Sequence, residues 1–322
     1  MPRLIIALLM TFAFQAEAHR SCEGLLAGSD RLVFTGVGGR DVYNPTKPFS
    51  IGFYGKTLTV MAARVEARDS ESSQAVFFTE ANGVWAPLIG APRFDMQDPF
   101  FTFINGELIF GGVETFEKPG GGGYRTLFFR GHSLEQLIPK KPFSQGPEGM
   151  KDIRLVAIAE GKIGLFTRPQ GMIPGTQIDA GPGKIGFKTI GGLDELTPEN
   201  ITNTPLIEGQ FFNGDWGGAN EAQILPNGKI GVLAHLARFD NQRNRYYYAA
   251  VFTVDPLTGA ASPIRIILER ASLTAGLNGE SKRPDLIDVV FSGGLHLDGP
   301  TATLFLGAGD AETHSMIISN PF

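Results

Sequence analysis

The sequence predicts an all-β fold in the form of a five-bladed β-propeller, and three observations support this prediction. Five glycine turns each begin a run of β-favouring residues, at intervals of roughly 50–70 residues. These turns lie at Gly55, Gly106, Gly161, Gly228 and Gly299. Helical periodicity is nearly absent, and a total of 42 glycines suits many tight turns between short strands. A repeated strand-turn-strand unit is typical of a radial array of small sheets, and two sandwich domains are the weaker alternative.

Short apolar runs bounded by Gly, Pro, Asn or Asp predict the strands. In chain order, strands are expected at 75–79, 100–104, 108–113, 126–130, 155–158, 230–233, 246–254 and 301–306. Segments 134–137 and 193–196 predict single helical turns at most, and the glycine-rich segments 120–123 and 181–183 predict loops. No break in composition suits a linker, so we expect one domain over residues 25–322.

The first 18 residues have the pattern of a cleavable signal peptide. Arg3 precedes an apolar run at 4–14, and the motif A-E-A at 16–18 is an A-x-A cleavage site. The run is too short to span a bilayer. We therefore expect a periplasmic or secreted protein without a membrane span in its mature form, with a buried N-terminal helix as the alternative. The single cysteine, Cys22, allows no internal disulfide.

Composition and motifs exclude several classes of function. The net charge of −5 argues against nucleic acid as a partner, because such proteins present a basic face. The five histidines show no paired spacing typical of metal ligands, and no dinucleotide, P-loop or G-x-S-x-G motif is present. We expect no metal and no cofactor. Chemistry based on carboxylates and arginines remains, with an oligosaccharide as the partner.

Four of the five repeats carry an acidic residue one short strand ahead of the glycine turn. These acids are Asp98, Asp152, Glu221 and Asp288. If the repeats close into a ring, the acids meet in one central pocket. Several carboxylates in one pocket suit sugar chemistry, in which one protonates the leaving oxygen while others hold hydroxyls or orient water.

Asp98, in the motif Q-D-P-F, is the candidate catalytic acid. Proline should hold the preceding residue in an extended conformation. The three phenylalanines Phe100, Phe101 and Phe103 should desolvate its carboxyl group, so that it keeps its proton and can donate it. An aspartate that only forms a turn is the alternative.

Two further motifs suggest sugar recognition. In R-V-E-A-R-D, strand alternation places Arg64, Glu66 and Arg68 on one face, either as ligand contacts or as a surface ladder of ion pairs. The motif W-G-G-A-N-E combines an aromatic ring, an amide and a carboxylate, which pack on sugar rings and bind hydroxyls. The expected substrate-binding residues are Arg64, Arg68, Asp69, Asp152, Trp216, Asn220, Glu221 and Asp288.

Basic residues in three motifs form a candidate anion site. The motif K-D-I-R supplies Lys151 and Arg154, F-T-R-P supplies Arg168, and K-R-P-D supplies Arg283. Guanidinium and ammonium groups together suit phosphate. Structural salt bridges to Asp152 are the alternative.

Seven motifs in order resemble a bacterial and protozoan family catalogued as a domain of unknown function. They are R-V-E-A-R-D-S-E, Q-D-P-F, G-M-K-D-I-R, F-T-R-P-Q-G, W-G-G-A-N-E, K-R-P-D-L-I-D-V-V-F-S-G-G and the closing N-P-F. That family is similar to the mannosyltransferase/phosphorylases of glycosyltransferase family 108 and, distantly, to the β-mannoside phosphorylases and hydrolases of glycoside hydrolase family 130. Both are families of five-bladed β-propellers. The resemblance covers essentially the whole chain after Val42.

The resemblance implies roles for three residues. Asp98 matches the general acid of the mannoside phosphorylases, which acts through a sugar hydroxyl. Arg168 matches a phosphate-holding arginine, and His235 resembles a further phosphate ligand. Two departures are Phe100, in place of an arginine after the proline, and Gln97, in place of an acid.

The implied function is an enzyme that cleaves or transfers β-linked mannosyl residues of oligosaccharides, by inverting phosphorolysis or hydrolysis. Inorganic phosphate enters only as a co-substrate in the first of these. A propeller that binds glycans without cleaving them is the alternative.

Overall fold

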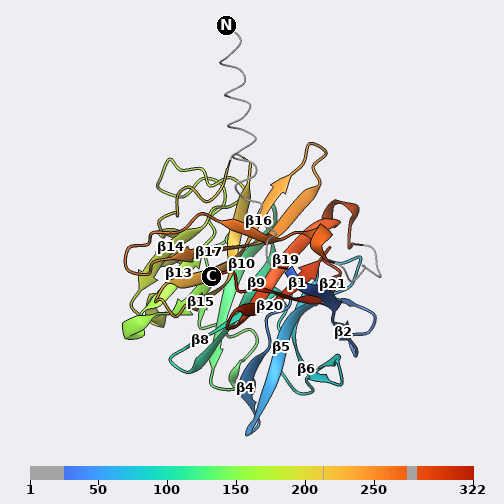
Figure 1. The fold of residues 1–322 in the computed structure, drawn as a ribbon. Coiled ribbons are helices and arrows are strands. Elements are labelled where there is room, and N and C mark those ends of the chain that lie inside the picture. Colours follow the sequence, from blue (N-terminus) through green and yellow to red (C-terminus); the bar gives the residue numbers. More distant parts are fainter. Residues whose placement is uncertain (1–24, 213, 274–280) are drawn as a thin grey trace.

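The computed structural model describes residues 25–212, 214–273 and 281–322 (Figure 1). The predicted signal peptide and Cys22 lie outside these residues. Strands dominate the described part of the chain, and none of its helices is long and apolar enough to cross a membrane.

Most strands belong to five successive antiparallel units, which we number in chain order. The first unit contains β4 (Phe49–Phe53), β5 (Lys56–Glu66), β6 (Ser73–Ala81) and β7 (Val84–Pro87). The second contains β8 (Gln97–Ile104), β9 (Glu107–Lys118), β10 (Gly121–Gly131) and β11 (Ser144–Gln145). The third contains β12 (Arg154–Ala157), β13 (Ile163–Thr167) and β14 (Gly186–Ile190).

The last two units share one sheet. The fourth contains β15 (Trp216–Ile224), β16 (Ile230–Phe239), β17 (Arg245–Val254) and β18 (Arg265–Leu268). The fifth contains β19 (Asp288–Asp298), β20 (Thr301–Ala308), β21 (Glu312–Ser319) and the N-terminal strand β1 (Leu25–Arg31). Only a short parallel pairing of β17 with β19 joins these two units. The short strands β2 (Val33–Phe34) and β3 (Asp41–Tyr43) pair with β7 and β5.

The predicted strands and the five glycine turns are confirmed by the structure, whereas the loop predicted at 120–123 is wrong from Gly121 on, because β10 begins there and pairs with β9. Each predicted run falls within an observed strand, except that Ile158 lies just beyond β12. Each of the five predicted glycines lies between the first and second long strands of a unit and has a positive φ, which glycine adopts without steric cost. The expected helical turns are the 3-10 helices η1 (Leu134–Gln136) and η3 (Leu193–Glu195). The short helix α2 (Pro198–Thr202), capped by Thr197, was not predicted.

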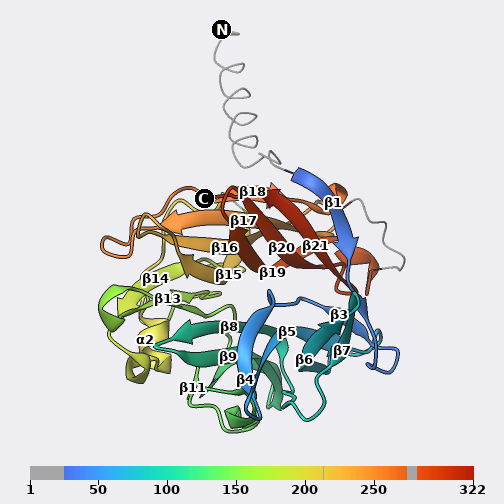
Figure 2. The ribbon, with the colours of Figure 1, turned by 60° about the horizontal axis from the view of Figure 1, so that its bottom comes forward.

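Strand β5 of the first unit and the first strands of the other four units lie next to one another in order. β5 contacts β8, β8 contacts β12, β12 contacts β15, and β15 contacts β19. The series closes because β3 contacts β20 and β21 of the fifth unit. Gly293 and Gly294 allow this closure, since a Cβ atom on either would overlap the backbone of Pro45 or Lys47. Figure 2 shows the units arranged around a common centre, with β1 beside β21.

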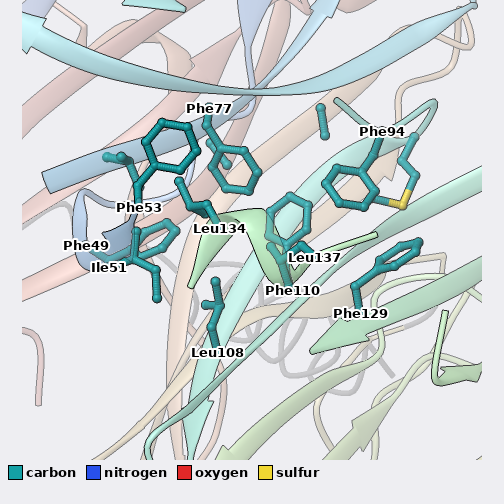
Figure 3. Close-up of a cluster of buried hydrophobic side chains, with 14 of the residues drawn as sticks. Phe49, Ile51, Phe53, Phe77, Phe94, Leu108, Phe110, Phe129, Leu134 and Leu137 are labelled. Atoms are coloured by element: carbon teal, nitrogen blue, oxygen red, sulfur yellow. The ribbon is translucent and has the colours of Figure 1, made fainter. Parts of the chain in front are cut away.

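The hydrophobic core lies between neighbouring units. One cluster joins the first and second units through aromatic residues such as Phe77, Phe94 and Phe110 (Figure 3). Further clusters lie between the second and third, the third and fourth, and the fourth and fifth units. A fifth cluster, in the first unit, packs against Phe305 of the fifth unit. Each unit therefore buries apolar side chains against both of its neighbours, which is the packing expected when small sheets repeat radially. The closed five-bladed β-propeller itself stays a prediction.

Candidate functional site

One cavity of about 270 Å³ lies where the first strands begin, and every unit contributes to its wall. The lining residues are Asn44, Arg64, Glu71, Gln97, Asp98, Lys151, Asp152, Arg168, His235, Arg245, Tyr247, Arg283, Leu286, Val289, Phe291 and Asp310. The structure thus brings together seven residues singled out from the sequence: Arg64, Asp98, Lys151, Asp152, Arg168, His235 and Arg283.

A β-bulge directs Asp98 into the cavity. The register of β8 against β9 shifts between Gln97, which pairs with Val113, and Phe100, which pairs with Gly111. Asp98 and Pro99 therefore oppose a single residue, and proline is tolerated at a bulge because it has no N–H to pair. The expected extended conformation of Asp98 is wrong, since its φ is 49°. The bulge overrides the usual effect of a following proline.

The carboxyl group of Asp98 lies in polar rather than aromatic surroundings. Its Oδ1 accepts hydrogen bonds from Nδ2 of Asn44 at 2.8 Å and from Nη1 of Arg64 at 3.3 Å. Among the described residues, Asn44 and Arg64 both contact this carboxyl group through Oδ1, which leaves Oδ2 for a ligand.

The phenylalanines that follow Asp98 pack elsewhere, so the expected desolvation by these rings is wrong. The ring of Phe100 lies under the guanidinium of Arg154, 4.1 Å from its Cζ. Phe101 stacks on Phe49 with ring centroids 3.9 Å apart, and Phe103 is 38% exposed. Strand alternation and the bulge together turn these side chains away from the carboxyl group.

Four polar residues of the cavity share a left-handed backbone. The φ angles of Asn44, Asp98, Asp152 and Asp310 are 48°, 49°, 56° and 52°. This region is sparsely populated by residues other than glycine, although Asn and Asp tolerate it best. Backbone strain of this kind costs roughly 1–3 kcal/mol per residue and tends to collect at functional sites.

Arg64 and Glu66 lie on one buried face of β5, as strand alternation predicted. Nη2 of Arg64 is 2.7 Å from Oε2 of Glu66, and Tyr43 donates to Oε1 of Glu66 at 2.8 Å. Lys282 of the last unit also contacts Glu66, which ties the fifth unit to the first. Glu66 thus holds Arg64 in place beside Asp98.

Arg68 and Asp69, expected as substrate contacts, do not line the cavity. β5 ends at Glu66, so strand alternation no longer aligns Arg68 with Arg64. Arg68 instead forms a two-bonded pair with Asp41 on the surface, with its Nη2 2.9 Å from Oδ1. Asp69 is exposed in the loop that follows β5.

Asp152 and Arg168 form a buried ion pair in the cavity wall. Nη1 of Arg168 donates to Oδ2 of Asp152 at 2.8 Å, and Nη2 of Arg168 donates to the carbonyl of Pro182 at 3.0 Å. Burial favours the neutral acid, but the charge of Arg168, with smaller contributions from His235, Lys151 and Arg154, outweighs it and holds the pKa of Asp152 well below its usual range. The carboxyl group is therefore ionised.

His235 lies beside this pair and is buried. Its Nδ1 is 2.8 Å from Oδ1 of Asn220, and its Nε2 is 4.0 Å from Oδ2 of Asp152. The pKa of His235 is lowered to about 3, chiefly by burial, with the nearby cations lowering it as well and Asp152 opposing the shift. The imidazole is therefore neutral at physiological pH.

Three residues that were expected to line the site lie behind the cavity wall and support it. Arg154 donates through Nε to the carbonyl of Asn220 at 2.7 Å, and its Nη2 is 4.0 Å from Oδ1 of Asp152. Asn220 is the extra residue of a bulge between β15 and β16, which turns it toward His235. Trp216 is buried edge-on against Tyr247, with ring centroids 6.0 Å apart. These three residues therefore do not line the cavity, contrary to expectation.

Glu221 and Asp288 are also placed outside the cavity, contrary to expectation. Glu221 follows the bulged residue, so it faces Lys47 and accepts a hydrogen bond from the backbone N–H of Leu295 at 2.6 Å. Asp288 begins β19 where that strand pairs with Tyr246 of β17, at the junction of two units. Both residues therefore have structural roles, Glu221 in an ion pair and Asp288 in strand pairing.

The sequence reasoning missed several residues of the cavity. Asn44 lies between β3 and β4 and precedes a proline, just as Asp98 does. This similarity between the N-P and D-P motifs could have identified Asn44 as a cavity residue. Arg245, Tyr247, Phe291 and Asp310 had no such signal. Tyr247 and Phe291 both lie against the ring of His235, with centroids 5.4 and 5.6 Å away.

Asp310 adds a second carboxyl group to the side of the cavity that holds Asp98. It lies in the turn between β20 and β21. Burial raises the pKa of Asp310, Asp98 and Glu66 raise it further, and Arg64 and Lys282 oppose the shift. A carboxyl group whose pKa is raised holds its proton more firmly, so Asp310 can offer a hydrogen bond to a ligand in the cavity.

The cavity is therefore lined by different kinds of side chain. Its wall contains the carboxyl groups of Asp98, Asp152 and Asp310, the cations Arg64, Lys151, Arg168, Arg245 and Arg283, and the apolar side chains Leu286, Val289 and Phe291. The described residues contain no group of three or more His, Cys, Asp or Glu side chains suited to hold a metal ion. The arrangement can bind an anion beside a small polar ring and place a carboxyl group next to both.

Comparisons with known proteins show the family of this chain. A family model described as "Protein of unknown function (DUF1861)" matches residues 18–322. A structure of a mannose phosphorylase from Leishmania mexicana, in complex with phosphate ion, matches with a TM-score of 0.80 and 30% identity over 98% of this chain and 94% of that one. A GDP-Man-dependent mannosyltransferase from the same organism matches with a TM-score of 0.79 and 29% identity, over 97% and 95%.

More distant structures share the fold. The β-1,2-mannobiose phosphorylase from Listeria innocua matches with a TM-score of 0.58 and 13% identity, over 91% of each chain. No curated protein matches the chain. The family model and the 30% identity to the Leishmania mannose phosphorylase both extend over nearly the whole chain, and this chain belongs to the DUF1861 family, related to the mannosyltransferase/phosphorylases of glycosyltransferase family 108.

Proposed function

We propose that this protein is a carbohydrate-active enzyme that cleaves β-linked mannosides by inverting phosphorolysis. One observation carries the proposal: Asp98 and a cationic wall that includes Arg168 and Lys151 line the same cavity. A proton donor and a phosphate site must face one glycosidic bond in such a reaction. The similarity to a mannose phosphorylase that binds phosphate supports the choice of substrate class.

The proposal includes a five-bladed β-propeller over residues 25–322. Five antiparallel units support it, because they touch in order through β5, β8, β12, β15 and β19 and because hydrophobic clusters lie between consecutive units. The N-terminal strand β1 pairs with β21, so the last unit is completed by the start of the domain. We also propose export through a signal peptide at 1–18, which N-terminal sequencing of the secreted protein would test.

Asp98 is the general acid in this proposal. Asn44 and Arg64 hold its Oδ1, which leaves Oδ2 to carry the proton toward the leaving oxygen, directly or through a sugar hydroxyl. The left-handed backbone and the bulge fix the direction of this side chain. The acid is thus positioned before the substrate arrives.

Phosphate is proposed to bind to Arg168, Lys151 and Arg283, with His235 at its side. A phosphate oxygen attacks C1 of the mannosyl group as the glycosidic C1–O bond breaks. Asp98 gives its proton to the leaving oxygen and regains one from the phosphate, so hydrogen phosphate and a β-mannoside become α-mannose 1-phosphate and a free hydroxyl. The cations stabilise the charge that the phosphate brings into the site.

The apolar side chains of the cavity wall are proposed to hold the sugar ring. Phe291 and Val289 offer a surface on which the faces of a pyranose can pack, and Asp310 is placed to hold a hydroxyl. A binding protein without turnover would use the same surfaces. The strained carboxylates favour the enzyme, because strain of this kind collects where chemistry needs pre-organisation.

A panel of β-linked manno-oligosaccharides, incubated with purified protein with and without phosphate, tests the proposal. Mass spectrometry of the products should show a hexose phosphate only when phosphate is present. Free mannose formed without phosphate would indicate hydrolysis instead. Binding of a glycan without any product would indicate a binding protein.

A further inference from the structure

The hydrogen bonds around His235 fix which of its ring nitrogens carries the proton. Nδ2 of Asn220 donates to the carbonyl oxygen of Ser292 at 2.7 Å and to Oγ of the same residue at 3.0 Å. The hydroxyl of Ser292 donates in turn to the carbonyl of Ala234 at 2.9 Å. A carbonyl oxygen only accepts, so the amide of Asn220 must turn its Oδ1 to His235. Nδ1 of His235 therefore donates, and Nε2 holds a lone pair.

The ring cannot easily turn over to exchange these nitrogens. Tyr247 stacks on it at an interplanar angle of 20°, and Phe291 lies on it at 37°. The side chain of His235 is only 2% exposed. Packing on both faces keeps Nε2 directed toward Asp152 and the cavity.

Two hydrogen-bond acceptors thus face each other without a donor between them. Nε2 of His235 is 4.0 Å from Oδ2 of Asp152 and has no hydrogen-bond partner among the described residues. The pKa values of both side chains are lowered, so Asp152 is ionised and His235 is neutral near neutral pH. Buried acceptors of this kind gain from a ligand that supplies a donor.

The charged groups around this pair attract an anion. Arg168 and Lys151 line the cavity beside His235, and Arg154 lies behind Asp152. An anion bound by these cations beside His235 can present one oxygen to the lone pair of Nε2. A fully ionised oxygen at that position would be repelled, whereas an O–H group would form a hydrogen bond.

We propose that this anion site selects an oxyanion that carries its own proton, hydrogen phosphate rather than sulfate, through an O–H donated to Nε2 of His235. The inference rests on the proposed phosphorolysis, because it concerns the phosphate of that reaction. Sulfate has the same shape and a similar charge, but it carries no proton near neutral pH. The position of the proton also matters for the reaction, because it leaves the attacking oxygen unprotonated.

Isothermal titration calorimetry of the wild-type protein with phosphate and with sulfate, at about pH 7.5 in two buffers of different ionisation enthalpy, tests the inference. One unpaired buried acceptor predicts that phosphate binds about 10- to 100-fold more tightly than sulfate. Phosphate should bind without net proton uptake by the protein. Equal affinities would show that Nε2 receives no O–H from the anion, and uptake of one proton with either anion would show that His235 becomes an imidazolium donor. Either result would overturn the inference.

A pair of variants locates the effect. Asparagine in His235→Asn keeps a donor near the position of Nδ1 but lacks Nε2, so the preference for phosphate over sulfate should fall to near one. His296→Asn, on the exposed part of β19, should keep the wild-type preference. An undiminished preference in His235→Asn would contradict the assigned donor. If that variant does not fold, the wild-type comparison still decides.

The outcomes separate this inference from the proposed function. Phosphate binding without preference over sulfate would overturn the selection by His235 and leave phosphorolysis standing. Failure to bind phosphate, together with release of free mannose from a β-mannoside, would overturn phosphorolysis and with it the inference.

Discussion

Nη1 of Arg168 lies 2.8 Å from Oδ2 of Asp152, and both side chains are almost completely buried at the wall of the cavity. Glycine makes room for this pair. A Cβ atom on Gly218 would lie 2.9 Å from Oδ2 of Asp152 and 2.9 Å from Cδ of Arg168, and a Cβ on Gly183 would lie 2.4 Å from Nε of Arg168. The second glycine of the W-G-G motif therefore leaves space for the ion pair. The ion pair in turn positions Arg168, which is proposed to hold phosphate.

Gly218→Ala should displace this pair. The added methyl group meets atoms of two buried charged side chains, and overpacking of this kind costs roughly 1–3 kcal/mol. We expect a lower melting temperature and weaker phosphate binding. Gly122→Ala is the matched control, because its Cβ would meet only a carbonyl oxygen, of Phe116, at 4.0 Å. Unchanged phosphate affinity in Gly218→Ala would show that Arg168 is not a phosphate ligand.

Asp98→Asn should remove turnover while leaving the fold intact. Asparagine keeps an oxygen that can accept from Asn44 and Arg64, so the melting temperature should change little. Loss of general-acid help should lower turnover by about 10²–10⁴-fold, with a much smaller effect on glycan affinity. Asp298→Asn, at the exposed end of β19, is the control expected to retain activity. Wild-type turnover in Asp98→Asn would exclude Asp98 as the acid.

His235 should make the folded state sensitive to acid. Its pKa is about 3 in the folded protein against an ordinary value of 6.5, so the unfolded chain binds a proton that the folded chain refuses. The stability that the neutral ring contributes is complete above pH 6.5 and is lost as pH falls toward 3. Urea unfolding should therefore show a smaller loss of stability between about pH 7 and about pH 4.5 for His235→Asn than for the wild type. Parallel losses would contradict the buried neutral imidazole.

Asp310 should have the opposite dependence on pH. Its pKa is raised by burial, so its contribution to stability is complete below its ordinary value of 3.8 and is lost as pH rises through the folded value. Asparagine resembles the protonated acid and tolerates the positive φ of 52°. Asp310→Asn should therefore melt at a higher temperature than the wild type near neutral pH, and the difference should shrink toward acid. A difference that is constant across pH would show that Asp310 does not titrate as proposed.

The repeated turns could be predicted from the sequence because their cause is local. Gly55, Gly106 and Gly161 each need a positive φ between two short strands, and that requirement is visible in the residues themselves. Asp98 and Arg168 were found because they lie in distinctive short motifs. Tyr247 and Asp310 were missed because only the closure of the units brings a mid-strand tyrosine and a turn aspartate to the same cavity.

Counting along the repeats misplaced Glu221 and Asp288 for a physical reason. A β-bulge decides which residue turns inward, and its position differs between units. In the second unit the bulge contains Asp98, whereas in the fourth it contains Asn220, so Glu221 faces Lys47. Register shifts of one residue cannot be read from composition or spacing, and they reverse the face that a side chain occupies.

The most direct test of the central claim is a ³¹P NMR time course of the wild-type protein with a β-linked manno-oligosaccharide and inorganic phosphate. The account predicts that the phosphate signal declines as a sugar 1-phosphate signal of α configuration appears, and that Asp98→Asn slows this conversion by about 10²–10⁴-fold. Loss of the oligosaccharide with an unchanged phosphate signal would contradict phosphorolysis.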